Sequence, residues 1–218
     1  AAKATAVPAG RALAVDRLAF SQYITQAIET HPRIEVVRER VDSLPTAPLA
    51  ILATGPLTSP AMAAEIQALL GETALYFYDA IAPTVYADSI DYEVVFRASR
   101  YEDGEGDYLN VPLYRDGYER FVDELVAAEP LPLHASEAAL YFEGCLPVEE
   151  MARRGRDTLA YGPMKPVGLT DPKTGRRPHG VVQLRQEDKA GILYNLVGFQ
   201  TRLRIPEQRR LFRSLPGL

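Results

Sequence analysis

The spacing of apolar residues in the first third of the chain predicts two helices and two short strands. A helix is expected over residues 16–30, capped by Asp16, because apolar side chains recur there on one face. Alternation predicts a strand at 33–38, and the continuous apolar run at 49–53 is typical of a buried parallel strand. A second helix is expected over residues 59–71, with proline near its start and glycine at its end. This order indicates an α/β unit.

The second part of the chain has a different pattern. It predicts helices at 114–128 and from Ser136 onward, strands at 181–185 and 192–199, and a final arginine-rich helix from Pro206. We therefore expect a mixed α/β (α+β) protein. The domain boundary is expected near residues 72–76.

The charge is divided unevenly along the chain. The 218 residues carry a net charge of −5, but residues 1–150 hold 10 Lys and Arg against 24 Asp and Glu, whereas residues 151–218 hold 14 against 5. The first part is thus −14 and the second +9. Such asymmetry fits a polyanionic partner for the basic part, and it equally fits two solvated faces that attract each other within one fold.

The single cysteine and the lack of a long apolar run restrict the compartment. One cysteine cannot form an intramolecular disulfide, so a reducing compartment, the cytoplasm first, is expected. No apolar run approaches the roughly 20 residues that span a bilayer, so no membrane partner is expected.

Cys145 is the first candidate for chemistry. Pro147 suits the first position of a helix through Met151, which would place the thiol near free backbone N–H groups. Helix N-termini and nearby cations lower the pKa of a thiol, and here Arg153, Arg154 and Arg156 follow. Cys145 can therefore be a nucleophile. The alternative is a small buried apolar residue.

Basic residues after Cys145 are candidates for anion binding. Lys165 stands at the centre of a stiff loop, residues 162–168, where it can meet a phosphate or carboxylate, although it can also be a solvated loop lysine. Further arginines could contact phosphates: Arg176, Arg177, Arg202, Arg204, Arg209, Arg210 and Arg213. No helix-turn-helix, zinc or RNP motif accompanies them. The isolated histidines predict no metal site, and no G-x-G-x-x-G, Walker or G-x-S-x-G motif occurs.

Six motifs closely resemble successive motifs of the TrmFO family, the folate- and flavin-dependent tRNA (uracil-5-)-methyltransferases. They are VPAGRALAVDRLAFSQ, ILATGPLTS, FEGCLPVEEMARRGRDTLAYGPMKPVGL, VVQLRQED, YNLVGFQTRL and EQRRLFRSLPGL. The resemblance runs essentially from end to end. The related GidA family of wobble-uridine-modifying flavoproteins shares the general plan without the FEGCLPVE block.

The resemblance implies an enzyme that makes 5-methyluridine in the T-loop of tRNA. Its cofactors would be FAD, 5,10-methylenetetrahydrofolate as one-carbon donor, and NAD(P)H as the reductant of the flavin. Residues 1–72 would be the later part of a Rossmann-like FAD-binding domain, and residues 73–218 an insertion domain that meets tRNA, with a mixed sheet and helices.

The resemblance also suggests site residues. Cys145 matches one of two cysteines implicated in the chemistry. Ala53, Thr54 and Gly55 match the strand-end turn that approaches FAD, and Val41 follows a strand that offers backbone groups to the adenine. Contacts to tRNA or to the folate glutamate are expected from Arg153, Arg154, Arg156 and Lys165.

Three parts of the family pattern are absent from this chain. These are the N-terminal G-x-G-x-x-G, the second cysteine and the C-terminal segment that completes the flavin site. We therefore expect the chain to be the middle portion of an enzyme, incomplete and inactive by itself. The alternatives are a non-catalytic RNA-binding module and a GidA-like enzyme of wobble-uridine modification. The oligomeric state is not predicted.

Overall fold

The computed structural model describes residues 1–55, 58–71, 81–101, 104–132 and 146–218. Its main element is a five-stranded antiparallel sheet in the order β3-β7-β6-β5-β4. The strands are β3 (Thr84–Tyr86), β4 (Phe96–Arg97), β5 (Leu109–Leu113), β6 (Gly180–Gln186) and β7 (Leu193–Leu196). A separate antiparallel pair joins β1 (Ala6–Val7) to β2 (Ala14–Val15). The predicted mixed α/β class is confirmed.

The two faces of the sheet are buried in different hydrophobic clusters, because successive strand residues point to opposite sides. Val111 pairs with Val182 in the register of β5 and β6, and both belong to the large cluster. Val181, the residue before Val182, packs instead with Phe96 and Leu169 on the other face. The central strands are thus covered on both sides.

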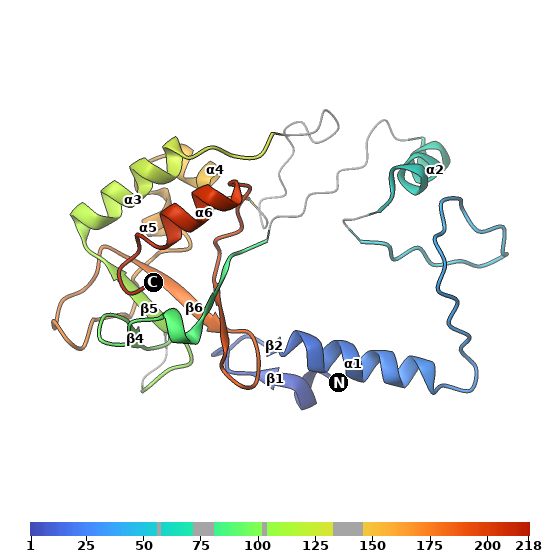
Figure 1. Cartoon of the computed structure of the whole chain (residues 1–218), viewed down its shortest axis with the longest axis horizontal. Helices are drawn as coiled ribbons and strands as arrows, with labels where there is room; N and C mark the ends of the chain where they lie inside the picture. Colours follow the sequence, from blue (N-terminus) through green and yellow to red (C-terminus); the bar gives the residue numbers. More distant parts are fainter. Residues whose placement is uncertain (56–57, 72–80, 102–103, 133–145) are drawn as a thin grey trace.

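Helices cover the face of the sheet that carries the large cluster (Figure 1). They are α3 (Arg115–Ala127), α4 (Val148–Arg153), α5 (Thr158–Tyr161) and α6 (Ile205–Phe212). Helix α3 is strongly amphipathic and buries Tyr118, Phe121, Val122 and Leu125. There are also two short 3-10 helices. Helix η1 (Ala2–Thr5) lies at the N-terminus, and η2 (Ala87–Ser89) follows β3. The predicted helix at 114–128 and the two predicted C-terminal strands are confirmed.

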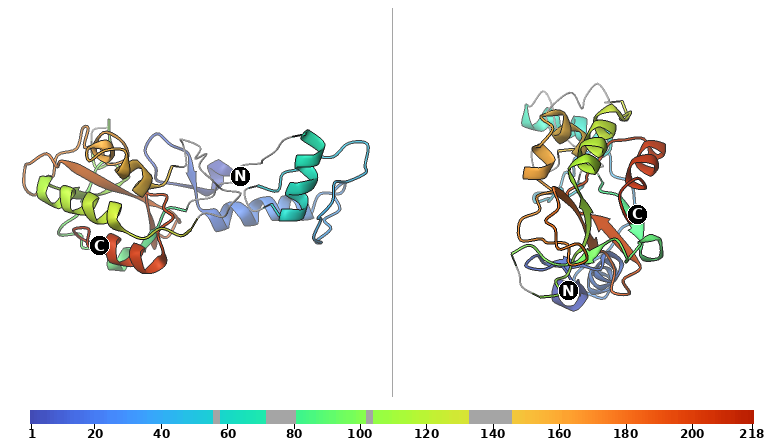
Figure 2. Two further views of the ribbon diagram at one scale, coloured as in Figure 1. Left: turned by 90° about the horizontal axis from the view of Figure 1, so that it is seen from above. Right: turned by 90° about the vertical axis from the view of Figure 1, so that its left-hand side faces the viewer.

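Helices α1 (Arg17–Glu29) and α2 (Pro60–Leu70) project away from the sheet (Figures 1 and 2). Both begin as the sequence predicts. The Asp16 carboxylate accepts a hydrogen bond from Ala19 N at 2.9 Å, and the Ser59 hydroxyl accepts one from Met62 N at 3.3 Å. Gly71 ends α2 at φ 67°, in the left-handed region that glycine adopts most easily.

The strands expected at 33–38 and 49–53 are wrong for this structure. Residues 31–55 contain neither helix nor strand, and Leu49 and Ile51 are 87% and 88% exposed. A parallel strand forms only beside neighbours that accept and donate its backbone hydrogen bonds, and no described segment lies there to do so. The apolar pattern is present without the sheet that would bury it.

Two other expectations concern residues that the structure does not describe. The helix expected from Ser136, like Cys145, lies outside the described residues. The predicted boundary near residue 72 borders residues 72–80, which are also outside, so the division into domains stays a prediction. Among the described residues, no helix is long and apolar enough to cross a membrane.

Candidate nucleic-acid interface

A buried carboxylate fixes the start of α4, which begins at Val148, shortly after the predicted nucleophile Cys145 in the sequence. Glu149 is 1% exposed, and its oxygens accept hydrogen bonds from Thr201 Oγ1 at 2.9 Å and Arg202 N at 2.7 Å. Val148 N donates to Gln200 O at 2.7 Å. The chain from Val148 onward is therefore tied to the segment after β7. Pro147 is the N-cap of α4 rather than its first residue, so the helix begins at Val148, one residue later than predicted.

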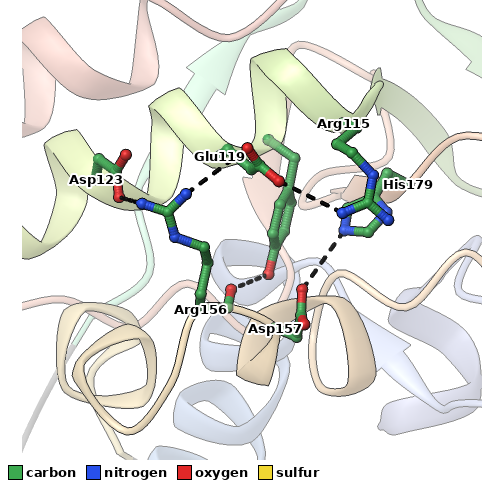
Figure 3. A network of polar contacts seen from close by, with 7 residues as sticks. Arg115, Glu119, Asp123, Arg156, Asp157 and His179 are labelled. Carbon is green, nitrogen blue, oxygen red and sulfur yellow. Dashed lines mark hydrogen bonds and ion pairs between the residues drawn. The ribbon is translucent and has the colours of Figure 1, made fainter.

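A network of polar contacts joins α3 to the turn between α4 and α5 (Figure 3). The Arg156 guanidinium lies 2.6 Å from Asp123 and 3.7 Å from Glu119, and Arg115 approaches Glu119 at 3.4 Å. These side chains are exposed, so each pair contributes little to stability. Their effect is to offset the positive charge of Arg156 with two carboxylates of α3.

The buried member of the same network is Tyr118. Its hydroxyl donates to Arg156 O at 2.8 Å and accepts from Ala160 N at 3.0 Å, and its ring meets His179 edge-on with 4.7 Å between centroids. Burial raises the pKa of Tyr118 above its usual value, so the hydroxyl stays protonated and able to donate. Tyr118 thus holds the turn between α4 and α5 against α3.

The structure separates the predicted tRNA-contacting residues into two kinds. Arg153 forms an ion pair with Glu150, and Arg156 is paired with α3 as described. Arg154 is exposed, and neither it nor Lys165 has an ion-pair partner in the part of the chain that the structure describes. Arg154 and Lys165 are therefore the two that are most available to an external anion.

The loop at residues 162–168 is held firmly from both ends. Met164 and Leu169 are 0% and 1% exposed, and Val181 N of β6 donates to Met164 O at 2.8 Å. Between these anchors, Lys165 Nζ lies 5.7 Å from the centroid of the Tyr101 ring. Sequence reasoning missed Tyr101, because nothing in the residues around it distinguishes it from an ordinary exposed tyrosine.

The arginines near the C-terminus divide in the same way. Arg204 pairs with Glu129 at 3.0 Å, and Arg210 bridges Glu124 and Glu207 at 2.8 and 2.9 Å. Arg209 and Arg213 line a groove of about 780 Å³ between β3 and α6. Arg176 lies over the ring of Tyr114, with its guanidinium carbon 4.5 Å from the centroid. Part of the positive charge of residues 151–218 is therefore already paired with carboxylates among the described residues.

The predicted FAD-contacting residues occupy an exposed part of the chain. The Ser59 hydroxyl donates to Asp42 at 2.7 Å, which links the residue after Val41 to the segment that follows Gly55. This bond and the bond from Arg40 hold the pKa of Asp42 below its usual value. Thr58 Oγ1 donates to Gly55 O at 2.7 Å and lies 2.6 Å from Thr54 Oγ1. The two predicted segments are thus linked through hydrogen bonds.

Gly55 gives this turn an open backbone. Its φ is 70°, a conformation that favours glycine, and a Cβ placed there would meet no heavy atom within 4 Å. Ala53, Thr54 and Val41 are exposed as well. The turn is therefore accessible, and its contact with FAD stays a prediction.

The predicted nucleophile, Cys145, lies outside the described residues. Helix α4 is six residues long, and Arg153 and Arg156 have carboxylate partners. The positive charge available after Cys145 is therefore smaller than the sequence indicates. Among the described residues, no group of three or more His, Cys, Asp or Glu could hold a metal ion.

The chain belongs to the glucose inhibited division protein A family, whose model matches residues 1–218. Relatives named methylenetetrahydrofolate–tRNA-(uracil-5-)-methyltransferase TrmFO agree with the resemblance seen in the motifs. The protein from Geobacter sulfurreducens is 62% identical over 100% of this chain, and that from Heliobacterium modesticaldum 58% identical over 100%. A third, from Citrifermentans bemidjiense, is 60% identical.

The match covers only part of these relatives. The chain spans 50% of the length of each of the three proteins. The predicted resemblance to the TrmFO family is confirmed.

Proposed function

We propose that this chain is part of a flavoenzyme that methylates uridine at C5 in the T-loop of tRNA, with methylenetetrahydrofolate as one-carbon donor. The observation that carries the proposal is 62% identity along the whole chain to a relative whose name states a folate-dependent tRNA (uracil-5-) methylation. The anchored start of α4 and the rigid loop around Lys165 lie within the sequence block that most resembles the family.

When bound, methylenetetrahydrofolate supplies a one-carbon unit and reduced FAD, regenerated by NAD(P)H, supplies the electrons that bring it to the methyl level. The open turn at Ala53, Thr54 and Gly55, with Val41, would hold the flavin nucleotide. The linked, exposed backbone of these segments supports that assignment.

Cys145 would activate the uracil. Its thiolate adds to C6, the C5=C6 electron pair moves toward C5 and O4, and C5 becomes nucleophilic enough to attack the one-carbon unit. Loss of the C5 proton to solvent and departure of the thiolate would then restore the double bond. The bound cofactors would complete the balance, with tetrahydrofolate as the leaving group of the one-carbon unit and reduced FAD as the donor of the two electrons. The target uridine must leave its stack to reach the thiolate, at a cost of a few kcal/mol. Contacts from Arg154 and Lys165 to the RNA would offset part of this cost.

A direct test uses the full-length enzyme, because the chain spans half of its relatives. With FAD, methylenetetrahydrofolate, NADPH and a tRNA transcript, 5-methyluridine should form, and each omission should stop it. A transcript whose T-loop uridine is replaced by cytidine is the control substrate. Absence of product from the complete mixture would contradict the proposal and favour a non-catalytic RNA-binding module.

The role of Cys145 is tested separately by Cys145→Ala. We expect product formation to fall by at least a thousandfold, because nucleophilic activation is lost, while the affinity for tRNA stays within about twofold. A variant that keeps its turnover would show that Cys145 is not the nucleophile.

A further inference from the structure

Tyr101 combines an unusual backbone conformation with an exposed aromatic side chain. It is the one described non-glycine residue with a positive φ, 65°, in a region that bulky side chains avoid. Its side chain is nevertheless not used to fill the core, since the residue is 58% exposed. Strained backbone that carries an exposed aromatic ring is typical of functional sites rather than of packing.

The surroundings of Tyr101 hold it in place. A Cβ on Gly168 would lie 3.4 Å from Tyr101 N, so the end of the 162–168 loop packs closely against this backbone. On the preceding residue, Arg100 Nη2 donates to Pro163 O at 2.8 Å. Because Met164 and Leu169 are fixed in the core, these contacts make Tyr101 and the loop one rigid surface.

Two basic side chains lie at this surface. Lys165 Nζ stands 5.7 Å from the Tyr101 ring centroid, and Arg100 lies behind it. Burial lowers the pKa of the Arg100 guanidinium, but not enough to remove its charge near neutral pH. No carboxylate among the described residues pairs with Arg100 or Lys165. Within the part of the chain that the structure describes, these two cations beside an exposed aromatic ring thus have no carboxylate partner.

We propose that Tyr101 and Lys165 form a contact for an unpaired nucleotide of RNA, in which the ring stacks on a base and the ammonium group pairs with a neighbouring phosphate. This inference rests on the proposed function and names the part of the chain that would hold the tRNA. Stacking on an aromatic side chain next to a cation that contacts the backbone is how proteins bind unpaired nucleic acid.

The role of each group follows from its chemistry. The Tyr101 ring offers a flat surface that accepts any base, and its fixed backbone means that little freedom is lost on binding. Lys165 supplies one salt-sensitive phosphate contact. Arg100 is a positioning residue, because its bond to Pro163 O orients the loop that carries Lys165.

The decisive variant is Tyr101→Gly in the full-length enzyme. Glycine removes the ring and also relieves the positive φ, so the melting temperature should stay the same or rise. The affinity for tRNA should nevertheless fall about tenfold. Tyr101→Phe, which keeps the ring, should bind tRNA within about twofold of the parent.

The matched control is Tyr23→Ala. Tyr23 is 50% exposed, similar to Tyr101, but it lies on α1, which projects away from the sheet. Its loss should leave tRNA affinity unchanged. If Tyr101→Gly binds tRNA as tightly as the parent, or if Tyr23→Ala weakens binding equally, the proposal is wrong.

Lys165→Gln gives an independent readout. It should weaken tRNA binding and reduce the slope of log affinity against log salt concentration by about one, the change expected when one phosphate contact is lost. Lys3 is an exposed lysine at the N-terminus, and Lys3→Gln should change neither quantity. An unchanged slope together with a raised KM for methylenetetrahydrofolate would assign the site to the folate instead and overturn the proposal. Binding is measured without turnover, so failure of the methylation assay would be seen separately.

Discussion

At the scale of single residues, Glu149 is a buried carboxylate with two hydrogen-bond donors. Glu149→Ala should lower the free energy of unfolding by about 3 kcal/mol, because Thr201 Oγ1 and Arg202 N would both lose their acceptor. Glu149→Gln, which keeps one acceptor oxygen, should cost about 1 kcal/mol. Urea denaturation measures both.

The neighbouring acid provides the control for this prediction. Glu150 pairs with Arg153 in a partly exposed ion pair, so Glu150→Ala should cost less than about 1 kcal/mol. Equal losses from Glu149→Ala and Glu150→Ala would show that the buried contacts of Glu149 do not hold α4 in place.

Asp171 makes the stability of the turn after the 162–168 loop depend on pH. Burial acts to raise the pKa of Asp171, but hydrogen bonds from Lys173 N, Thr174 Oγ1 and Tyr114 OH outweigh it and hold the pKa below its usual value. The stabilisation is therefore fully present above the unfolded pKa of about 3.9. It is lost as the pH falls from there through the lower folded pKa.

The substitution Asp171→Asn tests this dependence. At pH 7 it should cost about 1–2 kcal/mol of unfolding free energy, and the difference from the parent should shrink as the pH falls through the folded pKa. Asp88→Asn, at an exposed position, should show no such change. If the difference in unfolding free energy between Asp171→Asn and the parent stays constant down to about pH 2, the account is refuted.

At the scale of elements, one buried hydroxyl and several exposed ion pairs connect α3 to α4 and α5 (Figure 3). Tyr118→Phe should lower the free energy of unfolding by about 1–2 kcal/mol, since Arg156 O and Ala160 N lose their partner in a buried site. Arg156→Gln should cost less than about 1 kcal/mol, because its pairs are exposed. Thermal or urea unfolding that gave the reverse order would assign the connection to the ion pairs.

Local chemistry explains which elements could be predicted. The caps at Asp16, Ser59 and Gly71 act on their own helices, so they can be read without knowledge of the rest of the fold. Strand β5 was missed because Pro112 interrupts its pattern. The structure tolerates that proline because β4 pairs only with Leu109 and Asn110, so Pro112 lies beyond the end of β4.

At the scale of the whole molecule, the expected strands at 33–38 and 49–53 show that a local apolar pattern does not by itself predict a strand. Their apolar residues predict burial, yet Leu49 and Ile51 are almost fully exposed, because no described strand pairs with this segment. The candidate interface shows the same limit. Lys165 could be proposed from its loop, but its neighbour Tyr101, 64 positions earlier in the sequence, is brought to it only by the fold.

The measurement that tests the central claim most directly follows the one-carbon unit. The full-length enzyme would receive methylenetetrahydrofolate labelled with carbon-13 in its methylene group, and mass spectrometry would locate the label in digested tRNA. We expect the label in the methyl group of 5-methyluridine, within the T-loop fragment. Label at the wobble uridine would instead identify a GidA-like activity, and RNA without any label would contradict the methyltransferase altogether.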